Sequence, residues 1–404
     1  MPAGELFFLT PESLRESCGY VGLPEEVAPD VIAGGRRIAA GPALTALAWH
    51  ERRLLGEHKT NSRFWLAIAQ ALGDHAGMLH LIVLLSFIPE TRKLHEARGI
   101  PREIVLDTMS DFLLCMKRYR ALHGVWGVAD MYAGGWLQNH ITGVIYRLGR
   151  LQFIPAAFRR EVVAFRHRAS GAVAALVKSD REFRRDGYPN GAGGVTETEG
   201  LWRATFAEND AEAVGHPVDP ARGCALPRPV RLARAEWDRA LAPGEPTLDI
   251  HIPAGPPLAP EACRESLVRA TEFFPRHFPG KPFKAFVCGS WLFDAQLEQY
   301  LPPTSNLVRF LSEFYLLPAT GGRWSALRFV FQRLEGLHGG VAIPEDAAPE
   351  SMGLKDFPRR TTLERAILEH IERGGHWRAT GALLLVEDLP KYGTQAYRKQ
   401  RHPW

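Results

Sequence analysis

The chain has 404 residues, which is enough for two domains or for one large domain with an appendage. Hydrophobic residues make up 46% of it and charged residues 23%, proportions that are ordinary for a globular protein with a substantial core. The formal net charge of +4 is too small to predict a nucleic-acid-binding protein, and we interpret local basic clusters, such as residues 159–168, as solvated faces. We therefore expect no nucleic-acid partner.

The cysteines and the apolar segments bear on the cellular location. The five cysteines are an odd number and form no CxxC motif, so neither a disulfide framework nor a structural zinc site is expected. The first residues lack the charged and apolar regions of a signal peptide, and the most apolar run, Met78–Pro89, is too short to span a bilayer. The histidines at 58, 75 and 80 are not spaced to share one metal-binding face. These features predict a soluble, cytoplasmic protein of bacterial type, with no metal and no membrane partner.

The first third of the chain has the periodicity of helices. Apolar residues recur at three- and four-residue spacing, with Gly or Pro between the segments. This spacing predicts helices over Ala43–Leu55, Ser62–Leu85 and Pro101–Leu122, and a shorter one over Trp136–Ile141. At Gly143 the composition changes to that of strands. The sequence therefore predicts a helical N-terminal domain over residues 1–141 and a second domain over residues 142–404.

The second domain mixes strands with helices, which predicts an α+β or α/β fold. Strands are expected over Val144–Phe153, Val162–Phe165, Trp202–Phe206, Ala326–Gln332 and Gly381–Val386. Helices are expected over Ala233–Leu241, Phe293–Tyr300, Asn306–Leu316 and Thr362–Arg373, the last of them with a Thr-x-x-Glu-like cap. The glycine-rich segment 186–194 is followed by neither Gly-Lys-Ser/Thr nor a helix, so we interpret it as a mobile turn and not as a phosphate-binding loop.

The most informative segment reads as strand, turn, helix and strand over residues 248–289. In the first strand, apolar residues at 248, 250 and 252 alternate with Asp249 and His251, which therefore share the face opposite the core. Pro253 ends that strand because it has no N–H to donate. A glycine turn then leads to the predicted helix Glu261–Phe278 and to a strand over 284–289 that we expect beside the first. In α/β proteins such a unit is where ligands bind.

The turn after the first strand offers backbone donors. Prolines 256 and 257 have no N–H, so the donors are those of Ala254, Gly255, Leu258 and the first turn of the helix. Such N–H groups at the start of a helix bind phosphates well. We expect these residues, together with Ile252 and Ser266, to contact a cofactor.

Five phrases of the chain resemble those of GNAT-superfamily acyltransferases that join a helical N-terminal domain to a GNAT-like C-terminal domain. They are Arg147–Phe153, His251–Gly255, Ser266–Phe274, Cys288–Leu292 and Leu301–Asn306. The resemblance covers nearly the whole chain and implies an α+β fold, in which a GNAT-like mixed β-sheet flanked by helices follows the helical domain. It also implies an acyl-CoA-dependent N-acyltransferase, with acetyl-CoA or another acyl-CoA as substrate and a small-molecule or peptide amine as acceptor. The usual pyrophosphate signature, Gln/Arg-x-x-Gly-x-Gly/Ala, is not reproduced at residues 253–258.

Acyl transfer needs a group that removes a proton from the amine and a donor for the departing thiolate. We expect His251 to be the base, because its reference pKa of about 6.5 suits neutral pH, and Asp249 to orient it or to hold a cationic substrate. Ser290, or alternatively Tyr300, is placed to donate to the thiolate. The structural alternatives are that His251 is a hydrogen-bonded strand-end residue and that Ser290 caps the following helix. Cys288 has apolar neighbours, so we interpret it as a small buried hydrophobe.

Two other functions fit the same sequence. In one, the fold keeps the acyl-CoA cleft but acts as a non-catalytic acyl-CoA or metabolite sensor, which the missing pyrophosphate signature favours. In the other, the helical domain is a protein-interaction scaffold. Turnover of an acyl-CoA separates the enzyme from both, and stabilisation by CoA without turnover selects the sensor. The oligomeric state is left open.

Overall fold

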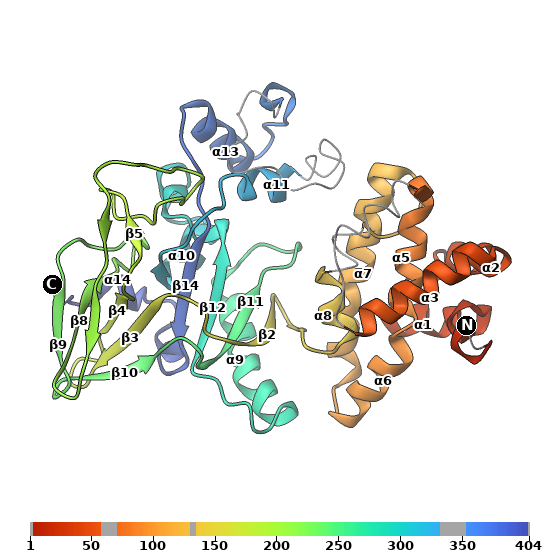
Figure 1. Ribbon diagram of the computed structural model, residues 1–404, viewed down its shortest axis with the longest axis horizontal. Coiled ribbons are helices and arrows are strands. Elements are labelled where there is room, and N and C mark those ends of the chain that lie inside the picture. The colour runs from red at the N-terminus through yellow and green to blue at the C-terminus, as the bar shows by residue number, and fades with distance from the viewer. Residues whose placement is uncertain (1–2, 58–70, 130–134, 332–352, 403–404) are drawn as a thin grey trace. The chain divides into compact units, whose positions relative to one another are not determined.

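The computed structural model describes residues 3–57, 71–129, 135–331 and 353–402. The chain divides into two compact units, the first made of Met1–Phe153 with Arg276–Phe278 and the second of Ile154–Pro275 with Pro279–Trp404 (Figure 1). The predicted domain boundary at residues 141 and 142 precedes this division, which falls inside strand β2 (Leu151–Ala157). Within the described residues, no helix has both the length and the apolar character needed to cross a membrane.

The first unit is a helical bundle, as the periodicity predicted. Its helices are α1 (Pro11–Val21), α2 (Ala28–Ala40), α3 (Pro42–Gly56), α5 (Ala76–Leu85), α6 (Ile88–Ala97), α7 (Arg102–His123) and α8 (Gln138–Ile141). The predicted helices over Ala43–Leu55 and Pro101–Leu122 are confirmed as α3 and α7. Part of the predicted helix Ser62–Leu85 lies outside the described residues, and its end is α5. Helix α5 is buried around its whole circumference, which explains why its sequence is apolar without a polar face.

Buried ionisable side chains join the helices of this unit. The His80 Nδ1 atom of α5 lies 2.6 Å from the Glu51 carboxylate of α3. Asp111 of α7 accepts hydrogen bonds from the Trp136 Nε1 group at 2.7 Å and from the Gln152 amide at 3.1 Å. Because each carboxylate is removed from water, these partners are what make its burial tolerable.

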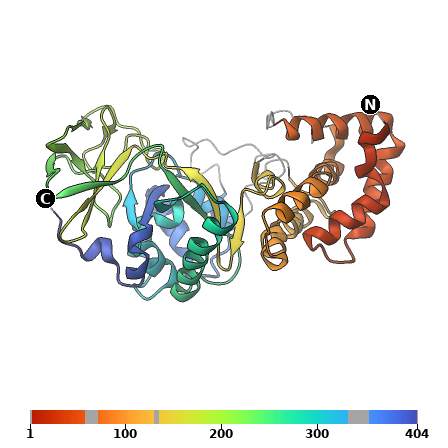
Figure 2. The same cartoon turned by 90° about the horizontal axis from the view of Figure 1, so that it is seen from below.

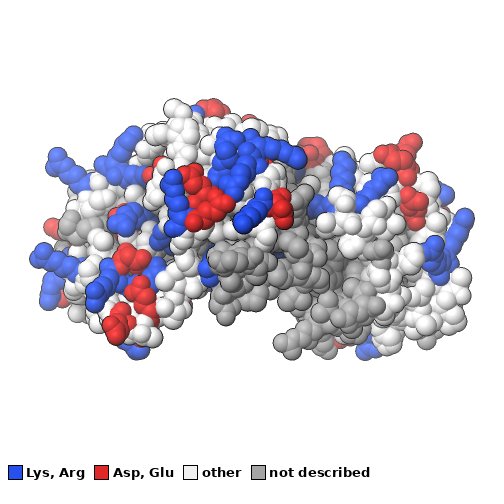
Figure 3. Space-filling view, turned by 90° about the horizontal axis from the view of Figure 1, so that it is seen from above, with Lys and Arg blue, Asp and Glu red and all other residues white. Residues whose placement is uncertain are grey.

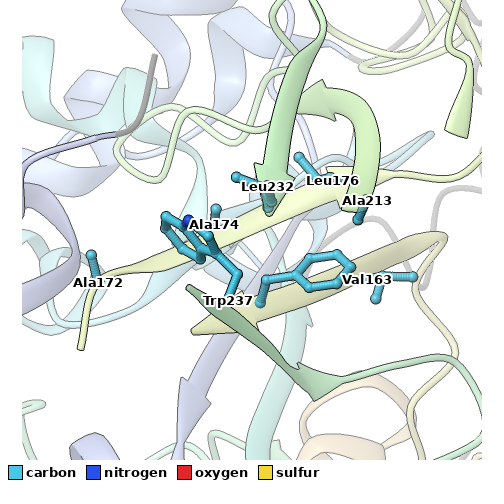
Figure 4. Close-up of a cluster of buried hydrophobic side chains, with 8 residues drawn as sticks. Val163, Ala172, Ala174, Leu176, Ala213, Leu232 and Trp237 are labelled. Carbon is cyan, nitrogen blue, oxygen red and sulfur yellow. The ribbon is translucent and has the colours of Figure 1, made fainter. Parts of the chain in front are cut away.

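The second unit contains most of a six-stranded mixed sheet and a separate antiparallel sheet. The first sheet has the order β1 (Tyr146–Leu148), β2, β11 (Pro246–His251), β12 (Ala285–Ser290), β14 (Thr380–Leu385) and β13 (Tyr315–Leu317). The second has the order β10 (Trp237–Leu241), β3 (Val162–His167), β4 (Val173–Val177), β8 (Glu212–Pro217) and β7 (Phe206–Glu208), with β9 (Val230–Ala233) also on β8. A short antiparallel pair of strands, the β5–β6 hairpin with its long connection, is made of β5 (Glu182–Phe183) and β6 (Trp202–Arg203) and lies outside both sheets. Trp237 and Leu232 belong to the core of the second sheet, which small alanines of β4 and β8 let pack closely (Figure 4).

The remaining helices of this unit are α9 (Pro260–His277), α10 (Asn306–Ser312), α11 (Ser325–Phe331), α13 (Thr362–Glu372) and α14 (Ala396–Lys399). Helix α9 connects β11 to its parallel neighbour β12, so the expected strand, turn, helix and strand are confirmed, with the two strands adjacent. The predicted cap of α13 is a full capping box, in which the Thr361 hydroxyl accepts from the Glu364 N–H and the Glu364 carboxylate accepts from the Thr361 N–H.

The strand register defines the two faces of the first sheet. Paired residues point to the same face, and residues two apart along a strand share a face. Asp249 of β11 pairs with Val287 of β12, and Gly289 two residues later pairs with Gly381 of β14. The β14 residue that pairs with Val287 also pairs with Tyr315 of β13. All of these residues therefore share one face of the sheet.

Different elements cover the two faces. On the face of Asp249, the Tyr315 hydroxyl accepts a hydrogen bond from the Ala175 N–H of β4, which places the second sheet on this side. On the other face, Phe274 of α9 contacts Phe283, whose ring contacts Phe286 of β12. Helix α9 is drawn in teal against the first sheet in Figure 2. The Asp249 face therefore looks toward the second sheet and the opposite face toward α9.

Three predicted elements are wrong or only half right, and packing explains each. In the segment Ala233–Leu241, predicted as a helix, residues 237–241 form strand β10. Its buried Trp237 and Leu241 are four residues apart, a spacing that also occurs on one face of a helix, and a bulge between Arg239 and Leu241 shifts the register of the strand. Residues 326–331, predicted as a strand, belong to helix α11 despite their β-branched and aromatic composition, and Gln332 lies outside the described residues. The predicted helix Asn306–Leu316 ends at Ser312 and continues into β13.

The segments 186–194 and 293–300 also differ from prediction. The glycine-rich segment is not a free turn, since the Gly193 N–H donates to the Gly321 carbonyl and the Arg184 guanidinium binds the Ala192 and Val195 carbonyls. Residues 293–300 form short 3-10 turns instead of an α-helix, because the buried Asp294 carboxylate accepts the Gln296 N–H and interrupts the helix.

Candidate active site

The candidate site lies where β11 and β12 separate. Their parallel pairing runs from Thr247 and Ala285 to Asp249 and Val287, while β12 stays paired with β14 as far as Ser290. Beyond Asp249 the Ile250 carbonyl accepts a hydrogen bond from the Cys288 thiol, at 3.1 Å. A side chain thus replaces the backbone ladder, and the ends of the two strands diverge from each other. Divergent parallel strands leave backbone groups available to a ligand.

An exposed turn connects this point to α9. Pro253 and Leu258 are buried and fix its two ends, whereas residues 254–257 are exposed. Helix α9 begins at Pro260, and the Cys263 N–H makes the first helical hydrogen bond, to the Ala259 carbonyl. The turn therefore leads directly into the positive end of an 18-residue helix.

Asp249 and His251 lie together on the face of the first sheet that looks toward the second. The Asp249 Oδ2 and His251 Nε2 atoms are 3.8 Å apart, which is beyond hydrogen-bonding distance. Burial raises the pKa of Asp249 to about 6, although Arg160 and Arg159 oppose the shift and 40% of its side-chain surface is exposed. The carboxylate is therefore largely ionised at neutral pH and begins to protonate just below it.

Arg160 belongs to the site and is the residue that our sequence interpretation missed. Its Nη2 donates to the Cys288 carbonyl at 3.2 Å, so it holds β12 just where that strand leaves β11. A Cβ atom on Gly289 would lie 2.1 Å from this nitrogen, and one on Gly381 would lie 3.5 Å from the Arg160 Nε. Glycine at 289 thus leaves the guanidinium room above the sheet, whereas a side chain at 381 would make only an ordinary contact with it. The available signal was a glycine inside strand β12, and its role becomes visible only once the position of Arg160 is known.

The other predicted catalytic residues are placed differently. Ser290 lies on the face opposite His251, and its hydroxyl oxygen accepts the Leu292 N–H at 3.2 Å, so it caps the turn that follows. The Tyr300 hydroxyl is hydrogen-bonded to His370 Nδ1 at 3.0 Å. Cys288 is buried, as expected, and burial raises the pKa of its thiol, which disfavours the nucleophilic thiolate.

The predicted cofactor residues fall into two groups. Ile252, Ala254, Gly255 and Leu258 line the turn itself. Ser266 lies inside α9, fully buried, and its hydroxyl donates to the Ala262 carbonyl at 3.0 Å. The structure therefore brings the turn residues together and leaves Ser266 within the helix packing.

The distribution of charged and metal-ligating side chains decides whether the structure offers a metal site or a continuous basic surface. Among the described residues, no three His, Cys, Asp or Glu side chains come together as ligands for a metal ion. On the face drawn in Figure 3, Lys and Arg side chains lie beside Asp and Glu and do not form an uninterrupted basic patch.

Comparisons with known proteins agree with this architecture. Residues 12–143 match the model of an N-acyltransferase N-terminal domain, and residues 145–384 match that of a GNAT-like C-terminal domain. The chain matches none of the curated proteins at a significant level.

Among solved structures, the chain resembles an acyltransferase mutant in complex with octanoyl-CoA, with 24% identity, a TM-score of 0.55 and coverage of 93% of this chain and 88% of the other. It also resembles an acyltransferase in complex with decanoyl-CoA and teicoplanin, with 24% identity, a TM-score of 0.55 and coverage of 92% and 87%. These likenesses support the fold. The GNAT-like model spans more than half of the residues, so the expected α+β fold and acyltransferase family are confirmed. The chain belongs to the family of acyltransferases in which an N-acyltransferase N-terminal domain is followed by a GNAT-like C-terminal domain.

Proposed function

We propose that this protein is an acyl-CoA-dependent N-acyltransferase that transfers its acyl group by direct attack of an amine on the thioester. The observation that carries the proposal is the separation of β11 from β12 after Asp249, next to an exposed turn and the start of α9. The similar proteins crystallised with octanoyl-CoA and decanoyl-CoA support a thioester of coenzyme A as donor. The donor is acetyl-CoA or another acyl-CoA.

The turn and α9 would hold the coenzyme. N–H groups of Ala254, Gly255 and Leu258, with those of the first turn of α9, donate to the diphosphate, and the helix dipole adds to the attraction. Ile252 lies between the turn and the strand, and its backbone N–H would donate to the thioester carbonyl and stabilise the negative charge that develops there. Ser266 acts indirectly, by fixing α9 through its hydrogen bond to the Ala262 carbonyl.

The reaction makes one bond and breaks another. The lone pair of the neutral amine attacks the thioester carbon, a C–N bond forms, and the C–S bond then breaks with the electron pair leaving on sulfur. His251 takes the proton that the amine loses, directly or through a water, and Asp249 stabilises the imidazolium that results. The thiolate of coenzyme A leaves readily because a thiol pKa lies at about 8.5, so the contribution of Ser290 is small.

The acceptor would be a small-molecule or peptide amine. The similar acyltransferase crystallised with decanoyl-CoA and teicoplanin supports an acceptor of this kind. An amine is protonated at neutral pH, and the Asp249 carboxylate would attract it to the site before His251 removes the proton.

The test is release of free thiol from octanoyl-CoA and acetyl-CoA in the presence of a panel of amines, with mass spectrometry of the N-acyl product. Turnover with some amine is expected, and His251→Gln should abolish most of it while calorimetry finds CoA affinity unchanged. His167→Gln is the matched control, since that half-buried histidine also ends a strand, in the second sheet. CoA binding without turnover of any amine would select the sensor instead, and absence of both would leave the scaffold.

A further inference from the structure

A cavity opens on the same side of the first sheet as Asp249 and His251. It has a volume of about 560 Å³, which is within the range of small-molecule sites. Its walls come from the first residues of β3, the end of β4, the β5–β6 hairpin and residues 318–320 after β13. Since β13 and β14 pair with Leu317 opposite Gly381, this cavity lies at the edge of the sheet where β12 ends.

Arg160 connects the cavity to the reaction site. It lines the cavity, and the same guanidinium donates to the Cys288 carbonyl and lies over Gly289. It also lowers the pKa of Asp249 through its charge, together with Arg159. A ligand held by these two arginines would therefore lie beside the face of β11 that carries His251.

The arginines that line the cavity differ in whether a carboxylate already pairs with them. Arg181 is paired with Glu161 at 3.0 Å, and Arg203 is paired with Glu182 at 2.8 Å. Among the described residues, by contrast, Arg159 and Arg160 have no carboxylate within ion-pair distance, and both line the cavity. Two arginines whose acidic neighbour Asp249 lies beyond ion-pair distance form a site for an anion, and carboxylates match the planar donor geometry of arginine.

We propose that this cavity binds the acyl acceptor through a carboxylate of the acceptor, so that the substrate class is an amine that also carries an acidic group. The inference rests on the proposed N-acyltransferase function. Arg159 and Arg160 hold the carboxylate, and the body of the acceptor fills the cavity beside Phe183 and Pro318. The amine then points along the face of β11 to His251. Neutral amines of the same size lack the charge-assisted hydrogen bonds and bind less tightly.

The test uses acylated products, because their binding does not require turnover. Calorimetry on the full chain compares N-octanoylglycine with N-octanoylglycinamide, which differ in the carboxylate. We expect the acid to bind wild-type protein at least about tenfold more tightly than the amide. Arg159→Gln should abolish this preference, and Arg203→Gln, which removes an arginine already paired in the same cavity, should keep it. Arg159 is exposed and makes no hydrogen bond among the described residues, so its replacement should not disturb folding.

Three outcomes decide the matter. Equal binding of acid and amide to the wild-type protein would overturn the proposal. A loss of affinity for CoA itself in Arg159→Gln, as large as the loss for the acid, would also overturn it by assigning the anion site to a phosphate of the coenzyme. The third outcome is that Arg159→Gln loses the preference for the acid while the wild-type protein releases no thiol from octanoyl-CoA with any amine. That result would uphold the anion site and reject the acyltransferase function.

Discussion

Replacing Asp249 by Asn should make the protein more stable and less active at neutral pH. Burial raises the pKa of this carboxyl from 3.8 to about 6, so its charge is disfavoured in the folded state. A shift of this size corresponds to about 3 kcal/mol, but 40% of the side chain is exposed and solvent screening reduces the value to about 1 kcal/mol. Asn removes the charge at similar volume, which should raise the Tm of the C-terminal unit by about 2–4 °C.

The sign of the pH dependence makes this prediction specific. An acid whose pKa is raised by folding contributes stability below its unfolded value of 3.8, and that contribution is lost as the pH rises through about 6. The variant should therefore be more stable than wild type at pH 7 and equally stable at pH 4, while its kcat/KM at pH 7 falls by about tenfold or more. Thermal unfolding at the two pH values, with the exposed Asp210→Asn as control, measures the effect. A lower Tm of Asp249→Asn at pH 7 would refute the reasoning.

Three further predictions concern the cofactor, the leaving group and the helical unit. Gly255→Val should weaken CoA binding, because a branched side chain would stand where the backbone approaches the diphosphate, and unchanged affinity by calorimetry would contradict this placement. Ser290→Ala should reduce kcat less than His251→Ala does, since its hydroxyl caps the turn at Leu292, and a larger reduction would restore it as a proton donor. Asp111→Ala should destabilise the helical unit by about 3–5 kcal/mol in chemical denaturation at pH 7 by leaving buried donors unpaired. Burial alone would raise the pKa of Asp111, but its interactions with His140, Trp136 and Gln152 outweigh this effect and hold the pKa below 3.8. The stability that the Asp111 carboxylate contributes is therefore lost as the pH falls through that lowered pKa. A destabilisation by Asp111→Ala that did not change with pH would contradict the role of this charge.

Periodicity predicted the parts of the fold in which one face is buried and the other exposed. Helix α7 and strand β11 follow their period closely, and the adjacency of β11 and β12 followed from the helix between them. Strand β10 and helix α11 escaped prediction, since the two buried residues of β10 are four apart, as in a helix, and aromatic residues gave α11 the composition of a strand. The local patterns of these two segments favoured the wrong element, and tertiary pairing and packing overrode them.

The candidate site was partly predictable for the same reason. Asp249 and His251 share a face because alternation along a strand is a local property. Ser290 has the opposite parity to Val287, the partner of Asp249, which put it on the α9 face, and this depends on the register of β11 and β12. Arg160 precedes β3 and reaches the end of β12 from a distance of 128 residues in sequence, so its basic segment looked like a solvated face. Long-range pairing alone brings it to the site.

The most direct test of the account is the pH profile of acyl transfer by His251→Ala compared with wild type, followed from pH 6 to pH 9 by thiol release and product mass. Loss of a general base should lower kcat/KM by about 10²- to 10⁴-fold at pH 7. The deficit should shrink toward pH 9, where more of the amine is deprotonated without help. Wild-type rates for His251→Ala across this range would contradict the assignment, show that the histidine is structural, and require another base in the cleft.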